Sequence, residues 1–135
     1  MLLKTGSRSM GLRKGRRMNR EIKFRAWSRE GEEMLSWERL ASSMGIGSIF
    51  MLWDDPQGYV LMQWIGLNDK FGSPIYEGDV LSLWPNGHVV FTEELAAFGV
   101  RTEDSGHLDL NPNIAFRSAV IGNIFEHPHL LKGQP

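Results

Sequence analysis

Two histidines near the end of the chain have a spacing that could serve a metal ion. His127 and His129 form an H-x-H arrangement, which places two imidazoles on one face of a strand, and Asp104 or Glu126 could complete a ligand set. Pro128 indicates a turn at this point, however, and the other histidines have no defined spacing to the pair. A metal-assisted hydrolase that uses His127 and His129 is therefore the last of the functions we consider.

Neighbouring carboxylates could supply general acid and base groups if their environments gave them different proton affinities. The pairs are Asp54 with Asp55, Glu77 with Asp79, and Glu93 with Glu94. Each pair lies beside a glycine, proline or hydroxyl residue in a predicted turn, where acidic side chains usually cap backbone N–H groups or face water. The chain has no cysteine, no G-x-S-x-G motif and no phosphate-binding P-loop. We therefore expect no enzyme, no cofactor and no metal.

Charge is distributed unevenly along the chain. Residues 1–20 contain seven Lys or Arg and no acid, so they carry +7 and the remainder carries −8, although the net charge is −1. An acidic body attracts phosphate backbones poorly. The basic segment is nevertheless a candidate for contact with nucleic acid or with an acidic partner.

The first 17 residues predict a basic, disordered tail, because they show no periodicity and are rich in Gly, Ser, Lys and Arg. An alternative is that Met18 is the true initiator and residues 1–17 are a translated leader. The purine-rich ribosome-binding sequence just upstream of a start codon tends to encode Lys, Gly and Arg when it is translated. The length of residues 18–135 is that of a single domain. The absence of cysteine, of a secretory signal and of a long apolar run predicts a cytoplasmic protein.

Alternating apolar residues over 22–26 predict a strand. Residues 34–37 either return as a second strand or open a helix over 36–44, whose apolar residues share one face; we favour the helix. The apolar run 49–53, the turn-like residues 54–58 and the run 59–65 predict a hairpin.

Asn86 and Gly87 stand between two apolar runs, which is a strong hairpin signal because both residues tolerate positive φ. We expect strands over 80–84 and 88–92, then over 98–102 and 107–110 around a turn at 104–106. Residues 92–94 could instead cap a single helical turn that ends at Gly99, but we favour the strands. A last strand over 118–125 precedes a terminal turn that carries Leu130 and Leu131. Many short strands with frequent turns and little helix predict a mainly β, α+β protein built as a small barrel or curled sheet.

The stretch from Met62 to Leu81, "MQWIGLNDKFGSPIYEGDVL", predicts two turns. Residues 69–72 fit a β-turn with aspartate first and glycine fourth. We expect positive φ at Gly72 or Gly78 and a backbone-capping role for Asp79. Phe71 at the tip of the first turn, together with Trp64, is a candidate partner contact.

The five tryptophans are at 27, 37, 53, 64 and 84. In strands they predict core packing, whereas exposed rings would serve base stacking or an interface.

Three blocks in order resemble the YopX family of phage and prophage proteins. They are "MNREIKFRAWS" with a following Met34, then "LMQWIGLNDKFGSPIYEGDVL", then "VIGNIFEHPHLL". The resemblance runs from Met18 to about Leu131. The departures from the family pattern are Ser28 for Asp, Trp64 for Tyr, Ile65 for Thr, Phe71 for a polar residue, and His127 for Asn.

The resemblance implies a small SH3-like β-barrel over residues 59–131, preceded by an N-terminal α+β piece over 18–58. It also implies a homo-oligomer encoded by a phage or prophage, and no established reaction. The turn residues that we expect to shape the domain are Gly66, Asp69, Gly72, Gly78, Asp79, Asn86, Gly87, Gly122 and Asn123.

The function most consistent with this sequence is a non-enzymatic binding or assembly module that acts through protein contacts, including self-association and contact with a host or phage protein. The alternative is a nucleic-acid-binding accessory protein that uses the basic tail and the aromatic rings of the barrel. The logarithm of its affinity for nucleic acid would then fall linearly with the logarithm of the salt concentration.

Overall fold

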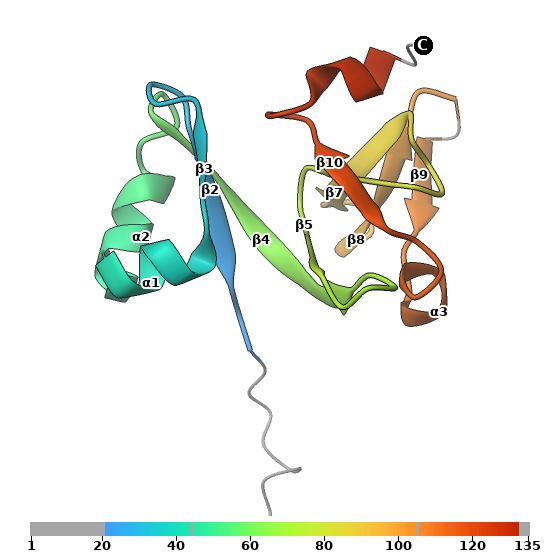
Figure 1. Cartoon of the computed structure of the whole chain (residues 1–135), viewed down its shortest axis with the longest axis horizontal. Helices are drawn as coiled ribbons and strands as arrows, with labels where there is room; N and C mark the ends of the chain where they lie inside the picture. Colours follow the sequence, from blue (N-terminus) through green and yellow to red (C-terminus); the bar gives the residue numbers. More distant parts are fainter. Residues whose placement is uncertain (1–20, 44, 105, 133–135) are drawn as a thin grey trace, which may run out of the picture.

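The computed structural model describes residues 21–43, 45–104 and 106–132. Its first part is a sheet covered by two helices (Figure 1). The elements in this part are β2 (Phe24–Ser28), β3 (Glu33–Leu35), α1 (Trp37–Ser43), α2 (Gly45–Trp53) and β4 (Tyr59–Asn68). Strand β2 lies between β3 and β4 and is antiparallel to both. The strand predicted over 22–26 is therefore present, shifted by two residues.

Helix α1 lies within the predicted range 36–44, of which Met44 falls outside the described residues. The Ser36 hydroxyl accepts a hydrogen bond from the Arg39 N–H at 3.2 Å, as an N-terminal cap does. Leu40, a residue of this helix, is buried. Residues 34 and 35 also pair with β2, so the two alternatives for this segment are both partly realised.

The strand predicted over 49–53 is wrong, because these residues belong to α2. Ile49 and Leu52 are buried, whereas Phe50, Met51 and Trp53 are exposed. Burial every third residue is a helical pattern, but a short, continuous apolar run has no periodicity by which sequence could separate helix from strand. The expected hairpin of 49–53 with 59–65 is consequently absent, and β4 pairs with β2 instead.

Strand β4 is long and serves both parts of the molecule, as its diagonal course in Figure 1 shows. Residues 59–63 pair with β2, and residues 64–68 pair with β5 (Pro74–Tyr76). The side chain of Leu61 packs on the cluster of Ala26 and Leu40 in the first part. Ile65 packs on a second cluster. The two hydrophobic cores therefore meet along one strand.

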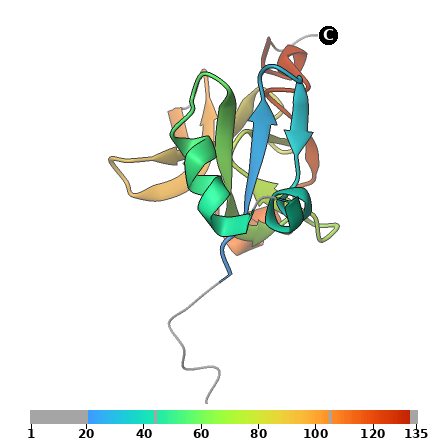
Figure 2. The same cartoon turned by 90° about the vertical axis from the view of Figure 1, so that its left-hand side faces the viewer.

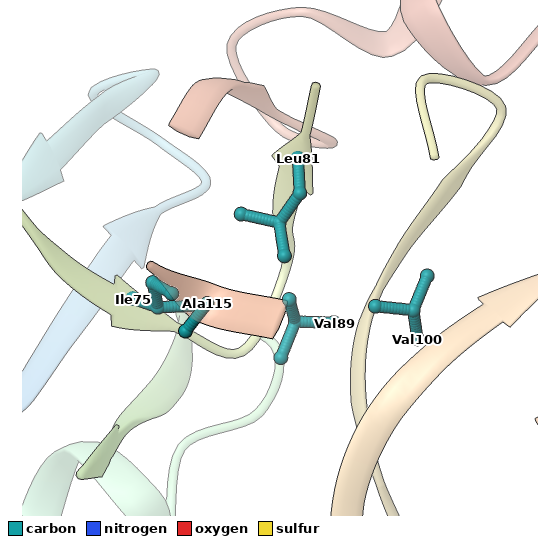
Figure 3. Packing of buried hydrophobic residues seen from close by; sticks show 5 residues of the cluster. All are labelled: Ile75, Leu81, Val89, Val100 and Ala115. Carbon is teal, nitrogen blue, oxygen red and sulfur yellow. The ribbon is translucent and has the colours of Figure 1, made fainter. Parts of the chain in front are cut away.

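The second part consists of curled sheets around that second cluster. Its elements are β6 (Asp79–Leu81), β7 (Gly87–Thr92), β8 (Ala97–Thr102), β9 (Gly106–Asp109), α3 (Pro112–Ala115), β10 (Val120–Asn123) and the 3₁₀ helix η2 (Pro128–Lys132). Strands β7, β8 and β9 form an antiparallel meander, while β6 pairs with β10. Figure 3 shows the cluster, to which five elements contribute Ile75, Leu81, Val89, Val100 and Ala115. The protein is mainly β, with few short helices and a half-barrel of strands.

The hairpin predicted at Asn86 and Gly87 is wrong. Strand β6 ends at Leu81 and pairs with β10 rather than with β7, and neither Asn86 nor Gly87 has positive φ. A Cβ on Gly87 would lie 2.6 Å from the Arg101 carbonyl oxygen, so glycine is needed here for the close approach of β8. Pro85 also has no backbone N–H that could donate a hydrogen bond to a neighbouring strand.

Later strands fall close to their predicted ranges. Strands β8 and β9 each begin one residue earlier than expected, and Ser105 in the turn between them is outside the described residues. Strand β10 is shorter than the predicted range 118–125, because the Ser118 carbonyl accepts the Lys70 N–H and Asn123 turns the chain.

Candidate functional site

Asp69 organises the turn between β4 and β5. One carboxylate oxygen accepts the N–H groups of Phe71 and Ser73, both at 2.9 Å, and the other accepts the Val120 N–H at 2.9 Å. Burial opposes ionisation of this carboxyl, but the three donors outweigh it and hold the pKa of Asp69 below its ordinary value. Asp69 thus fixes its own turn and also holds the start of β10.

Asp79 follows the next turn as the first residue of β6 and connects the two parts of the molecule. It accepts the Tyr76 N–H at 2.8 Å through one oxygen and the Arg25 guanidinium at 2.8 Å through the other. Arg25 also donates to the Glu77 carbonyl at 3.0 Å and lies 4.8 Å from the centre of the Tyr76 ring. Burial raises the pKa of Asp79, although Arg25 and the Tyr76 N–H act in the opposite direction.

The expected positive φ is present at both glycines of these turns, with φ 84° at Gly72 and 89° at Gly78. Gly66 has φ 92° as well. Nothing lies within 4 Å of a Cβ built on Gly72, whereas a Cβ on Gly78 would lie 3.2 Å from the Met62 sulfur. The same Cβ would lie 3.5 Å from the Phe125 ring, so Gly78 is enclosed by the packing between the two parts.

A groove of about 510 Å³ lies between β4 and the hairpin of β7 and β8. Figure 2 shows this hairpin projecting sideways from the body of the molecule. The groove is lined by Phe24, Arg29, Leu52, Trp53, Pro56, Tyr59, Val60, Leu61, Gln63, Glu77, Phe91 and Phe98. Trp53 is 63% exposed and Phe91 is 44% exposed, so large apolar rings face solvent along a groove that is itself open to solvent.

The two ends of the groove carry opposite charges. At one end the Glu77 carboxylate accepts the Gln63 N–H at 2.7 Å, and burial raises the pKa of Glu77. At the other end Arg29 donates from Nε to the Pro56 carbonyl at 3.0 Å. The register places Gln63 opposite Phe24 and Tyr59 opposite Ser28, so the two ends are about 13 Å apart at roughly 3.3 Å per strand residue.

The two predicted partner contacts differ in their accessibility. Phe71 is 76% exposed at the tip of the Asp69 turn. Trp64 is half-buried, its indole N–H donates to the Leu67 carbonyl at 3.0 Å, and the Lys23 ammonium lies 4.6 Å from its ring centre. Trp64 is thus held by its own strand, and neither residue lines the groove.

Asn123 ends β10 through its side chain. The buried amide oxygen accepts the N–H groups of Phe125 at 3.0 Å and Glu126 at 2.8 Å. A Cβ on Gly122 would lie 2.8 Å from Nδ1 of His127. These residues pack the C-terminal turn against the sheet.

His127 already has a structural partner, since its Nδ1 accepts the Asn123 N–H at 3.2 Å. The rings of His127 and His129 are 6.2 Å apart. Within residues 21–43, 45–104 and 106–132, no three His, Cys, Asp or Glu side chains are grouped closely enough to hold a metal ion.

The groove was not foreseen from the sequence. Its lining comes from β2, α2, β4, β7, β8 and the turn after β5, which are far apart along the chain. The available signals were Trp53, an aromatic residue beside a turn, and Glu77, which belongs to one of the carboxylate pairs. None of the helices in the part of the chain that the structure describes is long or apolar enough to cross a membrane.

The comparisons identify the family. A search of curated proteins finds no significant match. The crystal structure of protein EF1440 from Enterococcus faecalis is similar, with a TM-score of 0.59 and 27% sequence identity over 84% of this chain and 99% of that chain. The model of the family described as YopX protein matches residues 23–132. The chain therefore belongs to the YopX family.

Proposed function

We propose that the protein is a phage- or prophage-derived binding module of the bacterial cytoplasm that acts through protein contacts rather than by catalysis. The observation that carries this proposal is the groove between β4 and the β7–β8 hairpin, with Trp53 and Phe91 exposed along it. Exposed aromatic rings along an open groove are typical of protein-binding sites.

The proposal includes an SH3-like barrel in the second part of the chain. Its support is the single core to which β5, β6, β7, β8 and α3 contribute. In this arrangement β4 and the β7–β8 hairpin form the rim against which a partner binds.

Self-association is a separate part of the proposal, and we assign it to Phe71 because this ring is exposed away from the groove. Light scattering coupled to size-exclusion chromatography tests it. An oligomer that Phe71→Ser converts to a monomer is the expected result, and a strictly monomeric wild-type protein at high concentration contradicts it.

The groove is tested by affinity capture from host cells in which the prophage has been induced. The bait proteins are the wild type, the double variant Trp53→Ser/Phe91→Ser, and the control Phe116→Ser, whose ring is 64% exposed outside the groove. We expect a protein, identified by mass spectrometry, that the wild type and the control retain and the double variant loses. Identical capture by all three baits would refute the groove as the binding surface.

A further inference from the structure

The backbone groups of β4 alternate between two sides. The Trp64 N–H donates to the Lys23 carbonyl at 2.9 Å, so Trp64 points its backbone groups toward the β2 side. In an antiparallel pair alternate residues face the same neighbour, which assigns Met62 and Val60 to the β2 side as well. Gln63, Leu61 and Tyr59 therefore direct their N–H and C=O groups to the opposite side.

On that opposite side two of the three residues have partners. The Gln63 N–H donates to the Glu77 carboxylate at 2.7 Å, and the Gln63 carbonyl accepts the Glu77 N–H at 3.0 Å. The Tyr59 N–H donates to the Asp55 carbonyl at 2.9 Å.

Leu61 differs from its two neighbours. Among the described residues, no hydrogen bond uses the Leu61 N–H or C=O, which point away from β2. Leu61 also lines the groove. Strand β5 would cover this position if it continued, but the chain turns away at Gly78 into β6. The groove therefore contains an open strand edge centred on Leu61.

We propose that the partner inserts an extended segment into the groove as an added strand, hydrogen-bonded to Leu61 and continuing the line of β5. This inference rests on the proposed function and specifies its mode of recognition. Strand addition derives affinity from main-chain hydrogen bonds and specificity from the side chains beside them. Unpaired edge groups are the usual template for such pairing.

The charges at the groove ends specify the chemistry of that segment. It runs antiparallel to β4, as β5 does, so its N-terminal end lies beside Glu77 and its C-terminal end beside Arg29. A Lys or Arg followed four residues later by Asp or Glu, with an apolar residue next to each charge, matches both ends. The chain's own residues 1–20 contain no acid and do not fit the Arg29 end, which favours a separate protein as the occupant.

The probe is a pool of synthetic peptides of the form Gly-Lys-x-Thr-x-Asp-Gly, with capped termini and x as Val, Ile, Leu, Phe or Tyr. Binding to the full chain is followed by the amide NMR signal and hydrogen exchange of Leu61. We expect the signal to shift and its exchange to slow at least tenfold. An unchanged Leu61 amide would refute strand addition.

N-methylation of the best peptide separates strand addition from simple filling of the groove. Methylating one alternate set of its amides should weaken binding at least tenfold, and methylating the other set should leave binding unchanged. Equal effects of the two sets would refute the proposal.

The charges of the peptide are tested separately. Reversing the charge order, or replacing Lys by norleucine, should weaken binding to the wild type, and Glu77→Gln should abolish the preference for Lys over norleucine. Peptides that bind equally in both charge orders would also refute it.

Other occupants give distinct results. If the Leu61 amide is already protected in the free full-length chain, the groove holds the chain's own segment or a second copy, and the proposal is overturned. Groove-dependent capture of a host protein that leaves Leu61 unprotected would overturn strand addition while the proposed function stands. Failure of groove-dependent capture would overturn the proposed function itself.

Discussion

Asp69 and Asp79 stand ten residues apart at consecutive turns, and both are buried. Asp69 is surrounded by three backbone N–H donors, and its pKa is lowered. Asp79 receives one backbone N–H and a guanidinium, and its pKa is raised by burial. The same residue type at two successive turns therefore meets two different electrostatic environments.

The difference shows how each carboxylate contributes to the fold. Asp69 acts within the second part, where it joins the β4–β5 turn to β10. Asp79 acts between the parts, because its ion-pair partner Arg25 lies on β2, 54 residues earlier. One aspartate shapes a turn, and the other connects two hydrophobic cores.

The largest effect is expected for Asp79→Ala. Arg25 is only 12% exposed, and removing one partner of a buried ion pair destabilises a protein by about 3–5 kcal/mol because the other charge is left uncompensated. Urea unfolding of the variant and the wild type measures this loss. A loss below about 1 kcal/mol would show that Arg25 finds water or another acceptor.

Asp69→Ala should have a smaller effect, about 2–3 kcal/mol, since it removes hydrogen bonds to a charged acceptor but leaves no buried opposite charge. Phe71 and Ser73 are exposed residues, so we expect water to replace the carboxylate at their N–H groups. The same urea experiment ranks the two aspartates. A larger loss for Asp69→Ala than for Asp79→Ala would reverse the comparison.

The two turn glycines provide a matched pair. Gly72→Ala should destabilise by about 1–2 kcal/mol, which is the strain of a left-handed conformation alone. Gly78→Ala carries the same strain plus the approach of its Cβ to the Met62 sulfur, so we expect about 1 kcal/mol more, which is the lower end of the usual cost of overpacking. Thermal unfolding of both variants checks the order, and equal losses would mean that Met62 moves aside without cost.

The smallest effect is a pair of opposite pH dependences. The folded pKa of Asp69 lies below its ordinary value of 3.8, so its contribution is present above that pH and is lost as pH falls through the folded pKa. The folded pKa of Asp79 lies above 3.8 because the cost of burying its charge outweighs the attraction of Arg25, so ionisation of Asp79 makes the folded state less stable as pH rises from 3.8 through the folded pKa.

Stability measured by urea unfolding between about pH 3 and 7 tests these signs against the variants Asp69→Asn and Asp79→Asn. The advantage of the wild type over Asp69→Asn should shrink on acidification, and its advantage over Asp79→Asn should grow. Parallel pH profiles for the two variants would contradict the opposite pKa directions.

Features that depend on neighbouring residues could be predicted from the sequence. The positive φ of Gly72 and Gly78 and the capping by Asp79 follow from local turn chemistry. Helix α2 could not be predicted, because an apolar run of five residues fits either a buried strand or a helix.

The groove and the Arg25–Asp79 ion pair could not be predicted either, since they join residues that only the tertiary fold brings together. The hairpin expected at Asn86 is absent because β6 ends at Leu81, where Trp84 turns back to form an isolated bridge with Leu81, so the first of the two strands that Asn86 and Gly87 would connect is missing.

The double role of β4 also bears on how the chain folds. Its pairing with β2 joins residues as far apart as Phe24 and Gln63, and its pairing with β5 follows on the same strand. Neither core can close until β4 has found its register, because each core uses one half of that strand. Contacts so distant in sequence slow the search for the native topology. We therefore expect the two parts to form in a single cooperative step, set by one strand of ten residues.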